Sequence, residues 1–181
     1  MFTRWPEAGK AKTRLIPALG AAGAADLHRR LTERTVATVR AAGLRLEVRS
    51  TGADPARFRD WLGAETCVID QGEGDLGARL ARAAAAVPVL LLGADIPGLE
   101  AAHLRDAAAA LAVAPAVIGP AEDGGYWLLG LSVPAPQLFD SIAWGTDSVF
   151  AETVARLSAP VVLAMLADLD RPEDLARFAG I

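Results

Sequence analysis

The sequence predicts a three-layer α/β sandwich with a mostly parallel sheet. Apolar segments of strand length alternate with longer, often Ala-rich helical segments, which is the pattern of consecutive βα units. The segment 87–93 (VPVLLLG) is apolar at consecutive positions, as is typical of a strand covered on both faces. Neither a linker nor an internal repeat divides the sequence, so we expect one domain over residues 1–181.

The expected elements follow in chain order. The short apolar start before Pro6 predicts a first strand of only a few residues. Further strands are expected at 44–50, 66–70, 87–93, 116–119, 126–131 and 161–166. Helices are expected at 21–42, 55–62, 76–86, 101–112, 148–157 and 172–178. Ligands of such folds bind beyond the carboxyl ends of the strands, so polar residues there are the candidate site residues.

Charge and cysteine content exclude several function classes. The net charge of −4 argues against binding to nucleic acid or to anionic membranes. The single cysteine cannot form an internal disulfide, so a reducing cytoplasm is the expected compartment, and no Cys/His cluster predicts a zinc site. We expect Cys67 to be buried and His28 and His103 to lie on helix surfaces. The longest apolar stretch, 83–94, is too short to span a bilayer, and no secretion signal is visible.

A basic loop near the start predicts an anion site. The chain has sixteen arginines, but both of its lysines, Lys10 and Lys12, lie in the segment 6–14 (PEAGKAKTR) beside Gly9 and Arg14. A glycine-containing turn that leads into a helix combines backbone N–H groups, cationic side chains and a positive helix end, which favours a phosphate. The alternative is a solvated basic loop. The spacing does not match a Walker A loop.

Acidic residues follow two of the expected strands. Asp95 comes directly after the apolar run 90–94, and the cluster Asp168-Leu169-Asp170 follows the last strand. Two carboxylates from different strand ends that converge on one hard cation commonly hold Mg²⁺ or Mn²⁺ together with a diphosphate. Asp95 and Asp170 are therefore the candidate metal ligands. Capping or turn roles at the helices that follow them are the alternatives.

The segment 120–130 (PAEDGGYWLLG) places an acid beside two glycines. Gly124 and Gly125 let the backbone approach a ligand closely, Asp123 precedes them, and Tyr126 opens the next strand. A plain hairpin turn before an aromatic strand explains the pattern nearly as well.

Two further segments contribute to the candidate site. The later segment 144–147 (WGTD) supplies an aromatic surface at Trp144 and another carboxylate at Asp147, with core packing as the alternative for Trp144. The loop 71–77 (QGEGDLG) joins a strand to a helix with three glycines, so its backbone can pack against a flat base.

Six ordered motifs resemble one known family: GKAKTRL, QGEGDLGARL, GADIPGL, GPAEDGGYWLLGL, WGTDSVF and DLDRPEDL. They resemble the bacterial glycosyltransferases assigned to arsenosugar biosynthesis, a subset of a domain family long catalogued as of unknown function. The resemblance extends nearly end to end. It implies a GT-A type nucleotide-diphospho-sugar transferase fold, related more distantly to molybdenum-cofactor guanylyltransferases and to phospholactate guanylyltransferase.

The resemblance also implies roles for individual residues. The implied phosphate contacts are Arg4, Gly9, Lys12 and Arg14, and the implied base contacts are Gln71, Asp75, Leu76 and Gly77. The implied metal ligands are Asp95 and Asp170. Many GT-A enzymes carry an Asp-x-Asp motif at the strand end, whereas the segment 94–97 (ADIP) offers one carboxylate. We therefore expect metal binding to be weak without nucleotide.

These observations predict a metal-assisted glycosyltransferase that moves a sugar from a nucleotide-diphospho-sugar to a small acceptor, with Mg²⁺ or Mn²⁺ as cofactor. Asp123 is the candidate group that orients or deprotonates the acceptor. The candidate acceptor contacts are Gly124, Gly125, Tyr126, Trp144 and Asp147. A nucleotidyltransferase acting on a nucleoside triphosphate is the alternative, and a non-catalytic nucleotide-binding domain is the third hypothesis. The sequence leaves the donor, the acceptor and the oligomeric state open.

Overall fold

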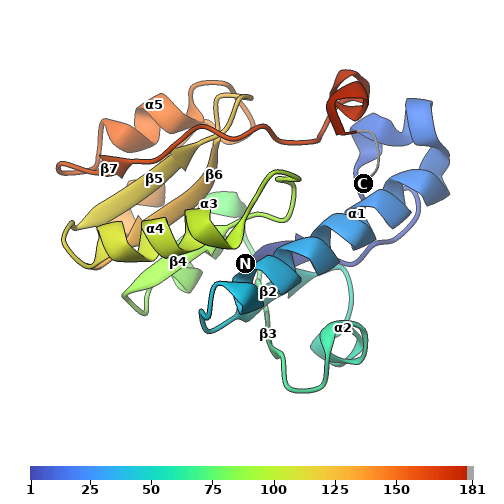
Figure 1. Ribbon diagram of the computed structural model, residues 1–181, viewed down its shortest axis with the longest axis horizontal. Helices are drawn as coiled ribbons and strands as arrows, with labels where there is room; N and C mark the ends of the chain where they lie inside the picture. Colours follow the sequence, from blue (N-terminus) through green and yellow to red (C-terminus); the bar gives the residue numbers. More distant parts are fainter. Residues whose placement is uncertain (179–181) are drawn as a thin grey trace.

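The computed structural model describes residues 1–178 and contains two sheets (Figure 1). The first sheet is parallel and has the order β1 (Phe2–Arg4), β2 (Glu47–Thr51), β3 (Cys67–Asp70). The second has the order β4 (Val89–Leu92), β6 (Tyr126–Leu131), β5 (Ala116–Pro120), β7 (Val161–Val162). Strand β6 is antiparallel to both of its neighbours, whereas β5 and β7 are parallel. The mixed α/β class with a parallel sheet is therefore confirmed, and β6 departs from the parallel arrangement.

Helices cover both sheets (Figure 1). The α-helices are α1 (Ile16–Ala41), α2 (Pro55–Leu62), α3 (Leu76–Ala83), α4 (Ala101–Leu111) and α5 (Val149–Val154). The short 3₁₀ segments are η1 (Thr13–Leu15), η2 (Pro136–Phe139) and η3 (Pro172–Phe178). No helix within residues 1–178 combines the length and the hydropathy needed to cross a membrane.

Helix α1 begins five residues before its predicted start at residue 21. Gly20 has φ 70°, so it interrupts the helical backbone and separates a first turn at 16–19 from the main helix. A positive φ is readily available to glycine because it has no Cβ. Pro17 suits the first turn, where its missing N–H would have no partner in the helix. The sequence pattern detected the main helix but not the turn before Gly20.

The central strands β5 and β6 are buried on both faces. Val117 and Leu128 belong to one core cluster, and their chain neighbours Ile118 and Leu129 belong to the other. All four side chains have 0% exposure. Full burial of a Val, Leu or Ile side chain contributes about 1.5–3 kcal/mol, so these two strands anchor the second sheet. This arrangement agrees with the layered architecture that the apolar runs predict.

A third cluster joins the two ends of the described chain. Leu169 is buried among Leu15, Leu27 and Leu31, and Phe178 packs at its edge. Figure 1 shows the red turn of η3 beside the beginning of α1. This packing brings residues 168–170 next to the basic loop that precedes α1.

Two expectations about burial are wrong. Cys67 is exposed because β3 is an edge strand, where Val68 faces the core and its neighbours face outward. His28 is buried because it shares the inner face of α1 with Ala24 and Thr32. The expected strand at 161–166 is also shorter, since only Val161–Val162 pairs as a strand.

Candidate functional site

Two adjoining cavities lie at the edge of the sheets where β1 and β4 end. The larger has a volume of about 840 Å³ and extends from the end of β4 across the β5–β6 hairpin to segments 144–149 and 168–174. The smaller, about 320 Å³, is lined mainly by the basic loop. Arg14, Asp95 and Asp170 line both cavities. The site therefore has a cationic part and an acidic part that share one wall.

The smaller cavity contains most of the predicted phosphate contacts. Arg4, Lys12 and Arg14 line it. Gly9 adopts φ 83° in the turn that reverses the loop, and it has open space around it. Lys10 is exposed and its Nζ lies 3.0 Å from Glu7 Oε1, so the two lysines of the loop have different environments.

Lys12 is the buried centre of an ion cluster whose other members are partly exposed. Its Nζ is 2.8 Å from Asp95 Oδ1 and 3.5 Å from Asp170 Oδ1, and it donates a hydrogen bond to Leu169 O. Arg14 Nη1 donates to Asp170 Oδ2. The side chain of Lys12 is only 3% exposed, whereas those of Asp95 and Asp170 are 48% and 29% exposed. The structure thus brings together the predicted phosphate contacts and the predicted metal ligands.

The two carboxylates fit a divalent cation in position and in chemistry. Asp95 follows β4, and its backbone O accepts from Leu169 N at 3.0 Å. Asp170 does not lie at a strand end, because β7 ends at Val162, so this bond holds the segment that carries Asp170 beside the end of β4. The capping alternative for Asp95 is wrong, because α4 starts later and is capped by Glu100 and His103. Asp95 Oδ1 is buried and has the Lys12 ion pair but no hydrogen bond. Carboxylate oxygens are the ligands that Mg²⁺ and Mn²⁺ prefer. No group of three or more His, Cys, Asp or Glu side chains within residues 1–178 is arranged to hold a metal, so protein ligands alone do not complete a coordination sphere.

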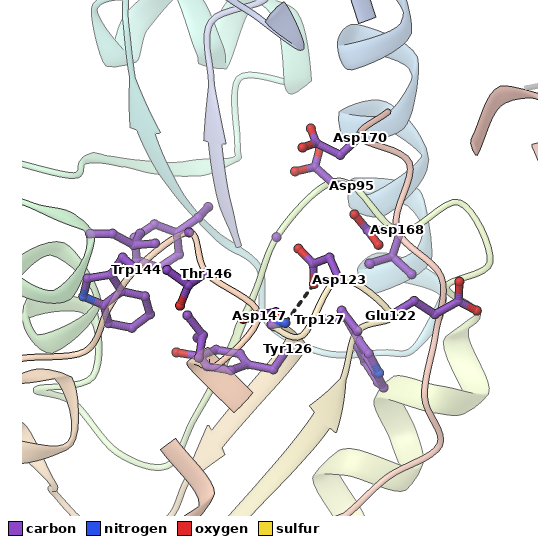
Figure 2. Close-up of a pocket in the computed structure, with 18 of the residues that line it drawn as sticks. Asp95, Glu122, Asp123, Tyr126, Trp127, Trp144, Thr146, Asp147, Asp168 and Asp170 are labelled. Atoms are coloured by element: carbon purple, nitrogen blue, oxygen red, sulfur yellow. Dashed lines mark hydrogen bonds between the residues drawn. The ribbon is translucent and has the colours of Figure 1, made fainter. Parts of the chain in front are cut away.

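The acidic part of the site centres on Asp123 and Asp168 (Figure 2). Figure 2 shows both side chains directed into the larger cavity, below the pair formed by Asp95 and Asp170. Burial raises the pKa of Asp168, and the charge of Asp123 raises it further. Because like charges in one cavity repel, this part of the site favours a cation or a neutral polar group over an anion.

The hairpin interpretation of the segment 121–125 is correct, and the same hairpin lines the cavity. Asp123 Oδ1 accepts from Gly125 N at 2.8 Å, an Asx turn, while the exposed carboxylate faces the cavity. Gly124 has φ 86°, and a Cβ there would lie 2.3 Å from Asp147 O. Phe150 N donates to Gly124 O at 2.9 Å. The glycine therefore docks the segment around Asp147 onto the hairpin.

An aromatic wall closes the other side of the larger cavity. Trp144 lies opposite the aspartates in Figure 2, and Tyr126 lies below Thr146. Burial raises the pKa of Tyr126, and its buried hydroxyl has no hydrogen-bond partner among residues 1–178. Helix α3 approaches this wall closely, because a Cβ at Gly77 would lie 2.7 Å from Phe139 O and 2.8 Å from Trp144 Nε1.

The residues predicted to contact the base, in the loop 71–77, have different roles in the structure. Gln71 is buried, and its Nε2 donates to Thr3 O and Arg49 O at 3.0 Å each, which ties the loop to β1 and β2. Asp75 caps α3 by accepting from Ala78 N at 2.9 Å. Leu76 lines the larger cavity. Gln71 and Asp75 therefore hold the loop, and Leu76 presents a surface to a ligand.

Sequence reasoning missed two residues of the site. His28 lines the smaller cavity, with Nε2 3.0 Å from Arg4 O, and burial lowers the pKa of its ring. Its helical spacing from Ala24 and Thr32 could have identified the inward face. Asp168 was visible in the acidic cluster, but its proximity to Asp123 is a tertiary feature.

Replacing Asp168 by Asn is expected to stabilise the protein at neutral pH. The pKa of Asp168 is raised on folding, so the unfolded chain loses this proton first and stability falls as the pH rises through the interval between the two pKa values. Asn does not titrate, so at pH values above that interval the variant should have a higher Tm than the wild type. The difference should be only about 1–2 °C, because solvent screens the charge of a half-exposed carboxylate. Thermal unfolding at several pH values measures this difference. Asp106→Asn, on the exposed face of α4, is the matched control. A variant less stable than wild type at pH 7 would contradict the repulsion.

Comparison with known proteins supports the fold and the family. Residues 34–146 match the family described as "uncharacterized protein conserved in bacteria" (DUF2064). A crystal structure from Desulfovibrio desulfuricans G20, of a protein provisionally named a nucleotide-diphospho-sugar transferase, is similar to this chain at 33% identity and a TM-score of 0.86. The similarity covers 94% of this chain and 80% of that one. The comparison with curated proteins found no match. This chain therefore belongs to the DUF2064 family and has the fold of the nucleotide-diphospho-sugar transferases.

Proposed function

We propose that this protein transfers a sugar from a nucleotide-diphospho-sugar to a small acceptor, assisted by Mg²⁺ or Mn²⁺. The observation that carries the proposal is the ion cluster. In it, cations of the basic loop meet Asp95, which follows β4, and Asp170, which precedes η3, between a cationic and an acidic cavity. A diphosphate needs cationic groups such as Lys12 and Arg14. A divalent cation bound to that diphosphate needs carboxylates such as Asp95 and Asp170. The structural similarity to the Desulfovibrio protein supports a glycosyltransferase-like function.

The donor diphosphate is assigned to the smaller cavity. Arg4, Lys12 and Arg14 would supply charge-assisted hydrogen bonds. Gly9 does not line this cavity, and its positive φ shapes the turn that precedes Lys12. Asp95 and Asp170 would hold the metal ion, which neutralises the negative charge that develops on the leaving diphosphate. Leu76 offers an apolar surface to the base or ribose.

The acceptor is assigned to the larger cavity, between Asp123 and Trp144. Asp123 orients the acceptor hydroxyl and takes its proton as the oxygen attacks the anomeric carbon. The bond between that carbon and the diphosphate oxygen breaks, and the bond pair leaves with the nucleoside diphosphate. Tyr126, Asp147 and Gly125 line the same space. Gly124 does not line it and acts by docking the segment around Asp147. The narrower assignment to arsenosugar biosynthesis remains part of this proposal, because it rests on the motif resemblance.

Isothermal titration with a panel of nucleoside diphosphates and triphosphates, with and without Mn²⁺, tests the proposal. We expect tighter binding of a diphosphate in the presence of Mn²⁺. Arg14→Ala should lose about 1.5–3 kcal/mol of that affinity, the typical contribution of a hydrogen bond to a charged group. Arg45→Ala, at the amino-end side of β2, removes the same charge away from the site and is the control.

Two outcomes of this titration would redirect the assignment. A preference for a triphosphate would favour nucleotidyl transfer with release of pyrophosphate. Binding of neither ligand class would refute the nucleotide site. Activity is measured as the slow hydrolysis of a sugar nucleotide without acceptor, by detecting the nucleoside diphosphate that is released.

A further inference from the structure

The groups assigned to two different ligands neutralise each other in this structure. Lys12 and Arg14 are the cations for the diphosphate, and Asp95 and Asp170 are the carboxylates for the metal. The ammonium group of Lys12 occupies the point on which both carboxylates converge, 2.8 Å from one and 3.5 Å from the other. A divalent cation shared by Asp95 and Asp170 would need the same place.

Lys12 is held in that place by its surroundings. Its side chain is almost fully buried, and its ammonium also donates to Leu169 O. Its backbone is left-handed, with φ 48° and ψ 47°, although it is not a glycine. Such a conformation persists where the surrounding structure determines it, and it often marks a functional position. Lys10, two residues earlier, is exposed and pairs with Glu7 instead.

We propose that this site selects the metal–diphosphate chelate as its ligand, because Lys12 stands in for the metal until both components bind. On binding, the ammonium leaves Asp95 and Asp170 for the phosphate oxygens, and the cation takes its place between the carboxylates. This inference rests on the proposed function. It adds that neither the free cation nor the free diphosphate is the preferred ligand.

Charge balance explains the selection. A free cation would have to displace Lys12 and leave a buried ammonium without a partner, which is costly. A free diphosphate would draw both Lys12 and Arg14 away and leave Asp95 and Asp170 unpaired beside its own negative charge. When both bind together, every charge keeps a partner. Each component therefore raises the affinity for the other by the same factor, on the order of 5–150-fold for coupled sites.

The test measures Mn²⁺ binding directly, from the electron paramagnetic resonance signal of the free aqueous ion. Wild type, Lys12→Met and the control Lys10→Met are titrated with Mn²⁺ alone. We expect weak binding by wild type and Lys10→Met, and binding tighter by about tenfold or more in Lys12→Met, within the range of such couplings. Loss of any nearby positive charge raises the affinity of the carboxylates for a cation to some degree. Lys10 lines the same cavity, so Lys10→Met removes an equal charge there, and a gain confined to the Lys12 variant reports displacement.

A second arm adds inorganic pyrophosphate, which tests the diphosphate without assuming a base. Pyrophosphate should raise the Mn²⁺ affinity of wild type by about 5–150-fold after correction for the complex formed in solution, and that of Lys12→Met by much less. Lys12→Gln, which keeps a donor for Leu169 O, replaces Lys12→Met if thermal unfolding shows that Met impairs folding. Equal Mn²⁺ affinities in wild type and the Lys12 variant would overturn the inference.

Asp95→Asn separates this inference from the proposed function. If Asp95→Asn loses Mn²⁺ binding in the presence of pyrophosphate but the Lys12 variants gain nothing, the metal site stands and the exchange is refuted. If Asp95→Asn binds Mn²⁺ as wild type does, the metal site is refuted and the exchange with it.

Discussion

Replacing Asp123 by Asn is expected to abolish sugar transfer while the fold stays intact. Asn can accept the same hydrogen bond from Gly125 N, so the Asx turn and the hairpin should persist. It cannot take a proton from the acceptor. A positioned acid or base typically contributes 10²–10⁴-fold, roughly 3–5 kcal/mol of the barrier. Turnover on the acceptor, Tm and diphosphate affinity are the three measurements, and only the first should change.

Wild-type turnover in Asp123→Asn would return this residue to a turn-forming role. Asp147, on the segment docked against the same hairpin, would then be the next carboxylate to test. Unchanged turnover together with an unchanged Tm would show that the Asp123 carboxylate is not the base.

Gly124→Ala should destabilise the protein and disrupt the acceptor side of the site. The added methyl group would lie 2.3 Å from Asp147 O, and Gly124 has φ 86°. The strained backbone and the collision together should cost about 2–4 kcal/mol, because overpacking and an unsuitable positive φ each destabilise. The segment 144–147 would move off the hairpin and take Trp144 with it. Denaturant unfolding and the fluorescence of the tryptophans measure these effects.

Gly145→Ala is the matched control for the collision. Gly145 has φ 83°, nearly the same as Gly124, but a Cβ there meets no atom within 4 Å. Its substitution should cost about 1 kcal/mol, from the backbone alone. If the two variants lose equal stability, the contact between Gly124 and Asp147 is not what docks the segment.

Much of the fold was predictable because its signals are local. The apolar runs at β4, β5 and β6 and the Asp-Gly-Gly turn each identify an element from a few adjacent residues. Only the hairpin interpretation of Asp-Gly-Gly indicated the antiparallel direction of β6. Its composition gave no direction, since a strand buried on both faces has the same apolar sequence in a parallel or an antiparallel sheet. Cys67 was misplaced for a related reason, because an apolar sequence does not show which strand lies at the edge.

The candidate site was predictable as a set of residue types but not as a set of contacts. The basic loop and the two strand-end acids were each visible in the sequence. Their direct pairing depends on the packing of Leu169 against Leu15, Leu27 and Leu31. It also depends on the hydrogen bond from Lys12 to Leu169 O, which joins residues 157 positions apart. The same packing places Asp168 near Asp123 and shifts its pKa. Tertiary contacts of this kind leave no periodic signal.

The bond from Lys12 to Leu169 also has a consequence for the order of folding. We expect the contact between Lys12 and Leu169 to form late, because a large loop must close before it contributes stability. The sheets can therefore assemble before the junction that forms the wall of the two ligand cavities. A ligand that bridges this junction fastens the beginning of α1 to the segment before η3. Amide hydrogen exchange at these two segments, far apart in the chain, should slow in concert when it binds.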